Sequence, residues 1–332
     1  MPDSYLSRDG ENVVIKVNNE VKFRIPIHNI EGIVCFGFMG ASPGLMQLCC
    51  ERGVALSFLT EYGKFMGRVT GNIHGNVMLR KTQYKWSDQE SIALRLSQRF
   101  IAAKIINSRS VLHRVLRDHP DSVDKVLLFR IISLMAQMPD RLSKAKDCEM
   151  VRGIEGEAAQ RYFEGFNELI LVNKDDFRML TRNRRPPTDK INALLSFLYT
   201  LLAHEVTAAL ESVGLDPQVG FLHKLRPGRP SLALDIMEEL RPHFADRLAV
   251  TLINRNQINA DGFKIKENGA VLMDDETRKE VLTAWQKRKQ EEIIHPYLEE
   301  KVPLGLIPYI QAMLLSRHMR GDLEDYPPFF WK

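Results

Sequence analysis

The stretch Tyr84-Lys-Trp-Ser-Asp-Gln-Glu-Ser-Ile-Ala-Leu-Arg-Leu-Ser-Gln-Arg-Phe-Ile-Ala-Ala103 is where the hydrophobic pattern of this chain changes its period. Within it, Ser87-Asp-Gln-Glu90 has the form of a capping box, in which Ser87 bonds the amide of Glu90 and Glu90 reaches back. Behind the box, apolar residues recur at the spacing of one helix face: Ile92, Leu96, Phe100 and Ala103. A domain boundary is therefore expected near residues 84–87.

Upstream of this stretch the chain has the two-residue period of β-strands. Residues 13–17 and 21–25 alternate apolar with polar side chains, and the pair Asn18-Asn19 between them tolerates the positive φ of a hairpin turn. Short apolar runs at 33–36 and 55–59 predict further strands. Between those runs, Ser42-Pro43 predicts the N-cap and first residue of a short helix.

Downstream of the stretch most of the chain has helical period. Helices are predicted at residues 122–138, 154–166, 191–213, 231–240, 277–298 and 307–318. One exception is residues 263–273, where Asn268-Gly269 at the middle predicts a β-hairpin. The predicted fold class is α+β. A small β-rich domain, residues 1–85, precedes a large all-α domain, residues 86–332, that carries a small hairpin insertion.

Composition sets limits on function. The 332 residues suffice for one large domain or two ordinary ones, and the net charge of +4 is too mild to announce a nucleic-acid partner by itself. The four cysteines show no Cys-x-x-Cys spacing, which argues against zinc-ribbon and redox sites. The longest apolar run, residues 191–203, is shorter than the roughly 20 residues of a membrane span, and the N-terminus has no signal pattern. A soluble cytoplasmic protein is expected.

The candidate chemistry lies in residues 220–242. His223 stands in a basic, proline-broken loop, and the following predicted helix carries Asp235 and Glu238 three residues apart, on one face of an otherwise apolar run. A solvated acidic stripe and a structural histidine are the plain alternatives. Further upstream, Glu155 lies next to Gly156 at the start of another predicted helix; the helix dipole explains acids there but not the nearby glycines.

Two carboxylates and one imidazole from three segments make a facial site suited to Mg²⁺ or Mn²⁺. An open site of this kind serves in-line phosphoryl chemistry, for which cations would hold the phosphates. Two basic loops offer such cations, although basic loops are often only solvated: Lys224, Arg226 and Arg229 in the first, and Arg178, Arg182, Arg184 and Arg185 in the second. Phosphate-binding, dinucleotide-binding and serine-hydrolase motifs are absent from the sequence.

Three motifs together resemble those of the CRISPR-associated integrase family, the first Cas protein ("Cas one"). They are Arg152-Gly-Ile-Glu-Gly-Glu-Ala-Ala159 with Tyr162-Phe163, then Gly220-Phe-Leu-His223, then Ser231-Leu-Ala-Leu-Asp-Ile-Met-Glu-Glu-Leu-Arg-Pro242. The gaps of 68 residues from Glu155 to His223 and 15 from His223 to Glu238 suit the family. The β-then-α order extends the resemblance over the whole chain, and the tail Tyr326-Pro-Pro-Phe-Phe-Trp-Lys332 is similar to that of the subtype I-C branch.

The resemblance implies that Glu155, His223 and Glu238 are metal ligands for Mg²⁺ or Mn²⁺, with Asp235 as their support. Many relatives have aspartate at the third ligand position, so glutamate here departs from the common pattern. The implied activity is spacer integration, in which the 3′-hydroxyl of a short DNA duplex attacks a phosphodiester at the edge of a CRISPR repeat. Relatives also cleave DNA by the same chemistry with water as the nucleophile.

The implied partners are double-stranded DNA, a second copy of the chain bound through the β domain, and the small second Cas protein ("Cas two") in a heterohexamer. Two other functions stay open from the sequence alone. In one, the chain is a non-catalytic DNA-binding scaffold whose acidic cluster is structural. In the other, it is a general metal-dependent nuclease.

Overall fold

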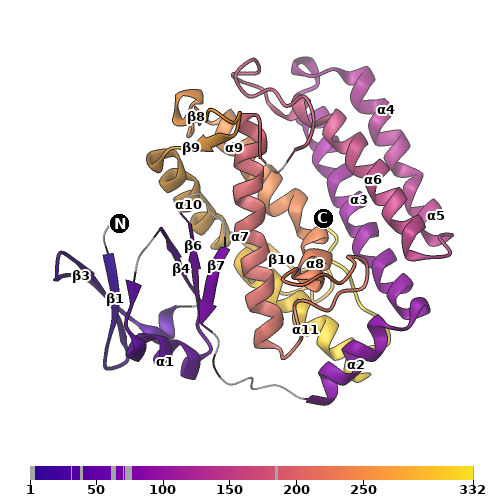
Figure 1. Ribbon diagram of the computed structural model, residues 1–332. Helices are drawn as coiled ribbons and strands as arrows, with labels where there is room; N and C mark the ends of the chain where they lie inside the picture. The colour runs from indigo at the N-terminus through magenta and orange to yellow at the C-terminus, as the bar shows by residue number, and fades with distance from the viewer. Residues whose placement is uncertain are drawn as a thin grey trace. The chain divides into compact units, whose positions relative to one another are not determined.

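The computed structural model describes residues 4–30, 32–37, 40–60, 65–69, 71, 77–183 and 186–331. The chain divides into two compact units, Met1–Gly75 and Asn76–Lys332. Figure 1 shows strands through most of the first unit, in indigo, and helices through most of the second, in magenta to yellow. A β-rich region followed by a mostly helical one confirms the predicted fold class.

The first unit begins with a sheet of order β3-β2-β1-β5, formed by β1 (Ser4–Asp9), β2 (Asn12–Val17), β3 (Glu20–Pro26) and β5 (Gly40–Ala41). Strands β1, β2 and β3 are antiparallel neighbours, and β5 runs parallel to β1. Asn18 and Asn19 join β2 to β3 with φ of 50° and 64°, which is the geometry that a two-residue hairpin turn requires. The predicted hairpin is confirmed.

A second sheet in this unit has the order β4-β6-β7, with β4 (Gly32–Phe36), β6 (Ala55–Leu59) and β7 (Phe65–Val69). Helix α1 (Pro43–Arg52) connects the parallel pair β4 and β6. As predicted, Ser42 is its N-cap, and the Ser42 Oγ accepts from the amide of Leu45 at 3.2 Å. Both sheets and α1 contribute buried side chains to one core: Leu6, Val13, Cys35, Leu45, Leu48 and Leu56.

The second unit begins with helix α2 (Val77–Ser87), so the expectation of β-structure up to residue 85 is wrong. The capping box is also wrong: Ser87 ends α2, and the N-cap of α3 (Glu90–Asp118) is Gln89, without a side-chain bond. The physical reason is a tertiary contact. Gln83, fully buried on α2, donates to the carbonyls of Asp216 and Val219 at 2.7 and 2.8 Å, and this holds α2 in helical form.

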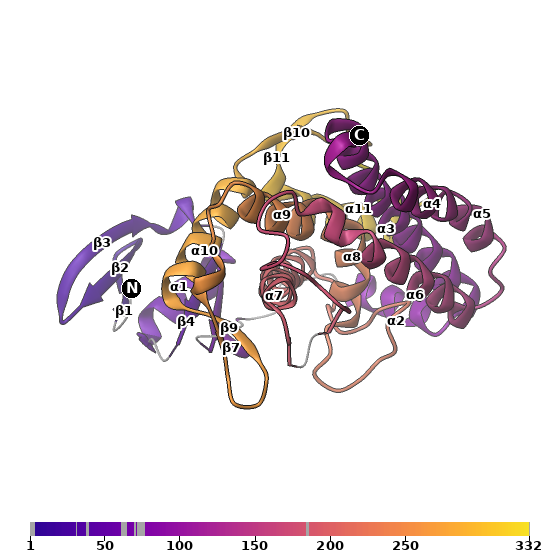
Figure 2. The same cartoon turned by 90° about the horizontal axis from the view of Figure 1, so that it is seen from above.

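Helices α3 and α6 (Cys148–Glu164) pack together with α4 (Lys125–Ala136) and α5 (Met138–Ser143), as Figure 2 shows. Helix α7 (Lys190–Ser212), seen end-on in Figure 2, packs against α8 (Ser231–Arg241) and α11 (Ile307–Arg320). A π-helical turn, Pro242–Asp246, joins α8 to α9 (Arg247–Asn254) without a break. The chain therefore carries α8 and α9 as one continuous helical rod alongside α3.

Two predictions in the C-terminal part have different outcomes. The hairpin is confirmed as β8 (Phe263–Ile265) with β9 (Val271–Met273), and Gly269 has the positive φ, 77°, of its loop. The helix predicted to reach residue 298 is instead α10 (Asp275–Lys289), followed by β10 (Glu292–Ile294) paired with β11 (Lys301–Pro303). Buried His295 stops the helix, because its Nδ1 accepts from the amides of two later residues.

Helix α7 is the one helix in the described ranges that is long and apolar enough to cross a membrane by length and composition. Much of it is buried inside the unit: 61% of its most apolar window lies in the protein interior. The buried residues include Leu194, Leu198 and Leu202. This pattern is typical of the central core helix of a helical domain.

Candidate metal centre

The carboxylates of α8 lie inside the protein. Asp235 is 0%, Glu238 2% and Glu239 0% exposed, which contradicts the alternative of a solvated acidic stripe. A buried carboxylate is costly unless hydrogen-bond donors or cations surround it. Each of the three has a different set of such partners, and these sets define three different roles.

Asp235 organises the loop that carries His223. Its Oδ2 accepts from the amides of Phe221 and Leu222 at 2.6 and 3.1 Å, and its Oδ1 accepts from the amide of His223 at 3.0 Å. The same Oδ1 lies 2.6 Å from the Nδ1 of His223. A proton held on Nδ1 leaves the lone pair of Nε2 available, as metal-binding histidines require.

Gly220 permits this close approach, as the sequence predicted. A Cβ at position 220 would lie 2.7 Å from Asp235 Oδ2 and 2.7 Å from the backbone of Ser231. By contrast, a Cβ at Gly153 or Gly156 would meet no described atom within 4 Å, so no contact within this chain explains those two glycines.

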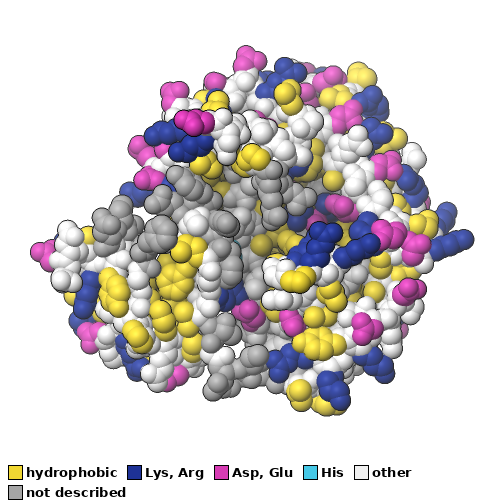
Figure 3. All heavy atoms as spheres, viewed as in Figure 1, with side chains coloured by type: hydrophobic (Ala, Val, Ile, Leu, Met, Phe, Trp, Pro, Cys, Tyr) yellow, Lys and Arg dark blue, Asp and Glu magenta, His cyan; other side chains and the backbone are white. Residues whose placement is uncertain are grey.

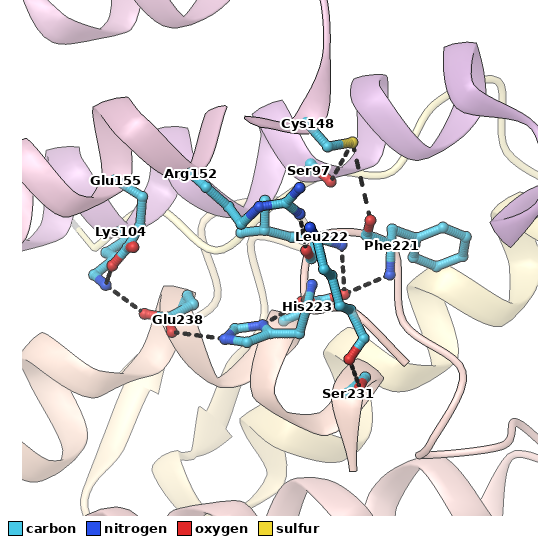
Figure 4. Close-up of polar contacts among 12 residues, drawn as sticks. Ser97, Lys104, Cys148, Arg152, Glu155, Phe221, Leu222, His223, Ser231 and Glu238 are labelled. Carbon is cyan, nitrogen blue, oxygen red and sulfur yellow. Dashed lines mark hydrogen bonds and ion pairs between the residues drawn. The ribbon is translucent and has the colours of Figure 1, made fainter. Parts of the chain in front are cut away.

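The three predicted ligands face one ammonium group, that of Lys104 on α3 (Figure 4). Lys104 Nζ lies 2.7 Å from Glu238 Oε2 and also pairs with Glu155 Oε1 from α6. His223 Nε2 points at Glu238 Oε1 from 4.0 Å. The structure thus brings together segments that are 51 residues apart in one pair and 134 in the other, by residue numbers 155 − 104 and 238 − 104.

Glu238 is held in its ionised form. Burial raises the pKa of this carboxyl, but the charges of Arg241, Lys104 and His223 outweigh burial and lower the pKa to about 2. Arg241 Nη1 contacts Glu238 Oε1 at 2.9 Å. The other oxygen, Oε2, is buried and makes no hydrogen bond of good geometry, so the Lys104 ammonium balances it by charge alone.

The donor set fits a divalent cation. Within the described ranges no three acidic, His or Cys side chains already converge as a ligand set, because Lys104 lies between Glu155 and Glu238. An ammonium shared by two carboxylates marks a position where positive charge is needed. The orphaned Oε2 of Glu238 and the free Nε2 of His223 are the donors that a hard or borderline ion would take.

Lys104 and Arg241 were missed by sequence reasoning. The signal for Lys104 is its position: it follows Phe100 by four residues and so falls on the apolar face of α3, where a lysine needs a partner. Arg241 has a similar signal, since it follows Glu238 by one helical turn.

The predicted phosphate contacts divide into two groups. Lys224 and Arg226 are exposed beside His223, with Lys224 pairing to Glu149 at 2.8 Å, and Arg229 is half-buried. Arg182 turns inward, donates to Asn192 Oδ1 at 2.6 Å and lies over the ring of Tyr199. The remaining members of the second basic loop are exposed Arg178, together with Arg184 and Arg185, which lie outside the described residues.

A cavity of about 570 Å³ adjoins the centre, between α3, α6, α7 and the π-helical turn. Lys104 and Glu155 form part of its wall, together with Tyr162, Arg182 and Asp246. Asp246 is buried and accepts from the hydroxyls of Tyr162 and Tyr199 at 3.0 and 2.7 Å, while burial raises its pKa to about 6. The metal ligands therefore open onto a space wide enough for a nucleotide.

Glu239 fastens the C-terminal segment beneath the centre. Its carboxylate accepts from the hydroxyl of Tyr326, the amide of Phe329 and the side chain of Gln311 at 2.8, 2.7 and 3.0 Å. Asn107 on α3 donates to the carbonyls of both Glu239 and Phe329. These bonds tie α3, α8 and the tail into one buried polar network.

The stability of the chain is expected to decrease as the pH rises, because of Glu239. Burial raises the pKa of this carboxyl from 4.5 to about 8. Between these values the folded protein holds a proton that the unfolded chain releases, so folding loses about 1.4 kcal/mol per pH unit across that window. Urea unfolding between pH 5 and 8.5 should show this decrease, and Glu239→Gln should flatten it.

The matched control for this experiment is Glu267→Gln, at an exposed position in the hairpin loop. It should keep the slope of the parent protein. A pH profile of Glu239→Gln as steep as that of the parent would remove Glu239 as the source of the dependence.

Comparison with known proteins places the chain among CRISPR proteins. The family model described as CRISPR associated protein Cas1 matches residues 1–287. The CRISPR-associated endonuclease Cas1 1 of Chlorobaculum tepidum is 50% identical over 329 residues, 99% of this chain and 96% of the relative. The CRISPR-associated endonuclease Cas1 2 of Rhodospirillum rubrum is 51% identical over 332 residues, 98% of this chain and 95% of the relative.

Solved structures share the fold. A CAS1 protein from Thermotoga maritima superposes with a TM-score of 0.81 at 22% identity, over 99% of this chain and 97% of that one. A Cas6-RT-Cas1–Cas2 complex matches with 0.80 at 23% identity, over 99% of this chain and 35% of that one. A Cas1–DNA complex matches with 0.52 at 14% identity, over 95% and 94%.

Proposed function

The chain belongs to the Cas1 family of CRISPR-associated endonucleases, and from that premise we propose that Glu155, His223 and Glu238 hold the divalent ion of its active site. The protein is an endonuclease and integrase of CRISPR adaptation. One observation supports the residue assignment above the others. Side chains from α6, from the loop before α8 and from α8 itself face a single ammonium group.

The ion is Mg²⁺ or Mn²⁺, and when bound it polarises a phosphodiester and steadies the attacking or leaving oxygen. Asp235 keeps the proton on His223 Nδ1 and so keeps Nε2 directed at Glu238. Lys104 and Arg241 hold Glu238 ionised. Because a DNA 3′-hydroxyl is the nucleophile and a DNA 3′-oxygen the leaving group, the number of phosphodiesters is conserved and no covalent protein intermediate is needed.

The DNA partners are a short duplex and the CRISPR repeat, whose edge receives the new spacer. Exposed Lys224 and Arg226, with Arg229 in the same loop, lie next to His223 and are suited to hold phosphates. Arg182 lines the cavity beside Glu155, where it can meet the strand that enters the centre. Arg184 and Arg185 belong to the same basic loop in sequence.

The first unit, extending to about residue 85 in sequence terms, is the dimerisation domain, and the helical unit is catalytic. Strand β3 is an edge of its sheet and leaves Val21, Phe23 and Ile25 exposed at 52%, 52% and 36%. Figure 3 shows hydrophobic side chains gathered on the surface of this unit. An apolar edge strand of this kind favours pairing with a second copy.

The dimer is expected to assemble with the small Cas2 protein in a heterohexamer, as in the relative whose solved complex contains Cas2. We assign the chain to the subtype I-C branch on its tail, Tyr326-Pro-Pro-Phe-Phe-Trp-Lys332. The cytoplasm is the compartment in which it would meet both the CRISPR repeat and free DNA fragments.

The function is tested by joining a labelled short duplex to a repeat-bearing plasmid, with Cas2 present, in Mn²⁺ and in excess chelator. Joining at the repeat edge that chelator abolishes is the expected result. DNA binding without joining or cutting under any metal would favour a scaffold. Cutting with no preference for the repeat edge would favour a general metal-dependent nuclease.

A further inference from the structure

Three arginines from three helices gather around one histidine, away from the metal centre. His243, in the π-helical turn, is buried and lies between them. Arg247 on α9 contacts its Nδ1 at 3.4 Å, and Arg288 on α10 donates to its backbone carbonyl at 2.7 Å. Arg114 approaches from α3, one turn beyond Ser110, whose hydroxyl lies 3.0 Å from the Nε2 of His243.

His243 does not contribute a charge to this group. Ser110 donates its hydroxyl proton to the carbonyl of Asn107 at 2.8 Å, so it accepts from His243 Nε2, and Nδ1 is left as the acceptor for Arg247. Burial and the three arginines lower the pKa of His243 well below its usual value. The positive charge of the site is therefore that of the arginines and is constant through neutral pH.

The arginines have too few carboxylates. Arg288 pairs with Glu291 at 2.8 Å, and Arg114 shares Asp118 with Arg117. Arg247 makes no ion pair among the described residues; its cationic group lies over the ring of Trp331 instead, 5.4 Å from the centroid.

The excess charge is partly buried, which makes it costly. Burial first, and then the charges of Arg288 and Arg114, lower the pKa of Arg247 to about 10. The Arg288 side chain is only 11% exposed, and its Nε is buried without a hydrogen-bond partner in the described structure. Half-buried cations that repel one another are unfavourable unless an anion joins them.

We infer that Arg114, Arg247 and Arg288 form a second phosphate-binding site, which holds the DNA backbone at a distance from the metal centre. This inference rests on the proposed function, because it takes DNA as the ligand. Guanidinium groups offer paired N–H donors that match phosphate oxygens, and Arg114, 55% exposed, leaves the site open to solvent. Trp331 also stacks on His243 at 4.3 Å and 7°, which fixes the surface behind Arg247.

The position of the site favours a polynucleotide over a small phosphate. Helix α3 and the rod of α8 and α9 run side by side in the same direction: Lys104 meets Glu238, Asn107 meets Glu239, and Ser110 meets His243. Arg114 lies ten residues beyond Lys104, or about 15 Å along α3 at 1.5 Å per residue. That spacing equals about four nucleotides of a B-form strand, so one DNA strand can reach both sites.

The test measures binding of a labelled duplex by fluorescence anisotropy in chelator, between 50 and 250 mM NaCl. Loss of one phosphate contact should reduce the slope of log K against log salt by about 0.9. Arg247→Gln should show this reduction and bind about tenfold more weakly at the lowest salt. Arg247→Lys, which keeps the charge, should keep the slope and lose only part of the affinity.

The matched control is Arg320→Gln, which removes an exposed arginine paired with Asp322 at the end of α11 and should change neither quantity. An Arg247→Gln slope equal to that of the parent protein would overturn the inference, whether or not the variant melts earlier. If phosphate, at ionic strength matched with NaCl, stabilises the parent but not Arg247→Gln while the DNA slope is unchanged, the site takes free phosphate and the DNA assignment is overturned.

The outcome is separable from that of the metal centre. Binding in chelator needs no chemistry, and His223→Ala, which changes only the centre, should keep the full salt slope. Failure of the proposed function would appear in the joining assay, whereas failure of this inference appears only in the slope of Arg247→Gln.

Discussion

His223→Ala is expected to reduce Mn²⁺-dependent joining of a short duplex to a repeat-bearing plasmid by more than about 100-fold. The variant removes the one nitrogen donor of the proposed ligand set. The fold should remain, because Asp235 still accepts from the amides of Phe221, Leu222 and residue 223 after the imidazole is gone. Circular dichroism and thermal melting would check that the helical unit is intact.

Two further variants sharpen this test. Asp235→Asn keeps the imidazole but weakens its orientation, so a smaller loss of about 10- to 100-fold is expected. His119→Ala, at an exposed position beyond α3, should join at the rate of the parent protein. Full joining activity in His223→Ala would remove this residue from the active site and with it the assignment of the centre.

Lys104→Met should destabilise the metal-free protein by about 3 kcal/mol, in line with the removal of one partner from a buried ion pair. Without the ammonium, Glu155 and Glu238 face each other, and Glu238 Oε2 is left buried with no cation beside it. A divalent ion bound between the carboxylates would supply the missing charge. Addition of Mn²⁺ should therefore recover much of the stability of the variant.

Calorimetry in chelator and in Mn²⁺ measures both effects. Lys125→Met, which removes an exposed lysine paired with Asp121, is the control and should change stability by less than about 0.5 kcal/mol in either condition. If Mn²⁺ stabilises Lys104→Met no more than it stabilises the parent protein, the carboxylates do not share an ion, and the network is structural.

The proposed ligands could be found from the sequence because each is an unusual residue for its surroundings. Glu238 is an acid in an apolar helix, and His223 follows a glycine that permits close approach. What the sequence did not reveal is the cation that joins them, since Lys104 is separated from Glu238 by 134 residues and by the path of three intervening helices. Local patterns identify the donors of a site but not the partners that tertiary packing adds.

The same limit explains the errors in the fold. Ser87 has all the local features of an N-cap, yet Gln83 extends the preceding helix because its amide reaches backbone carbonyls more than 130 residues away. Glu239 looks like a surface residue beside Glu238, but the tail covers it. By contrast, turns such as Asn18-Asn19 and caps such as Ser42 depend only on neighbouring residues and were predicted correctly.

The anchoring of the tail on Glu239 has a consequence for biosynthesis. Asn107 is bonded to the backbone of Phe329 and Trp331, which the ribosome adds more than 220 residues later. The core beneath the carboxylates therefore cannot close on the growing chain until translation is almost complete, even though the first unit can fold early. A nascent chain stalled before residue 329 would carry all three proposed ligands and still expose Glu239, which makes it a target for chaperones rather than a functional nuclease.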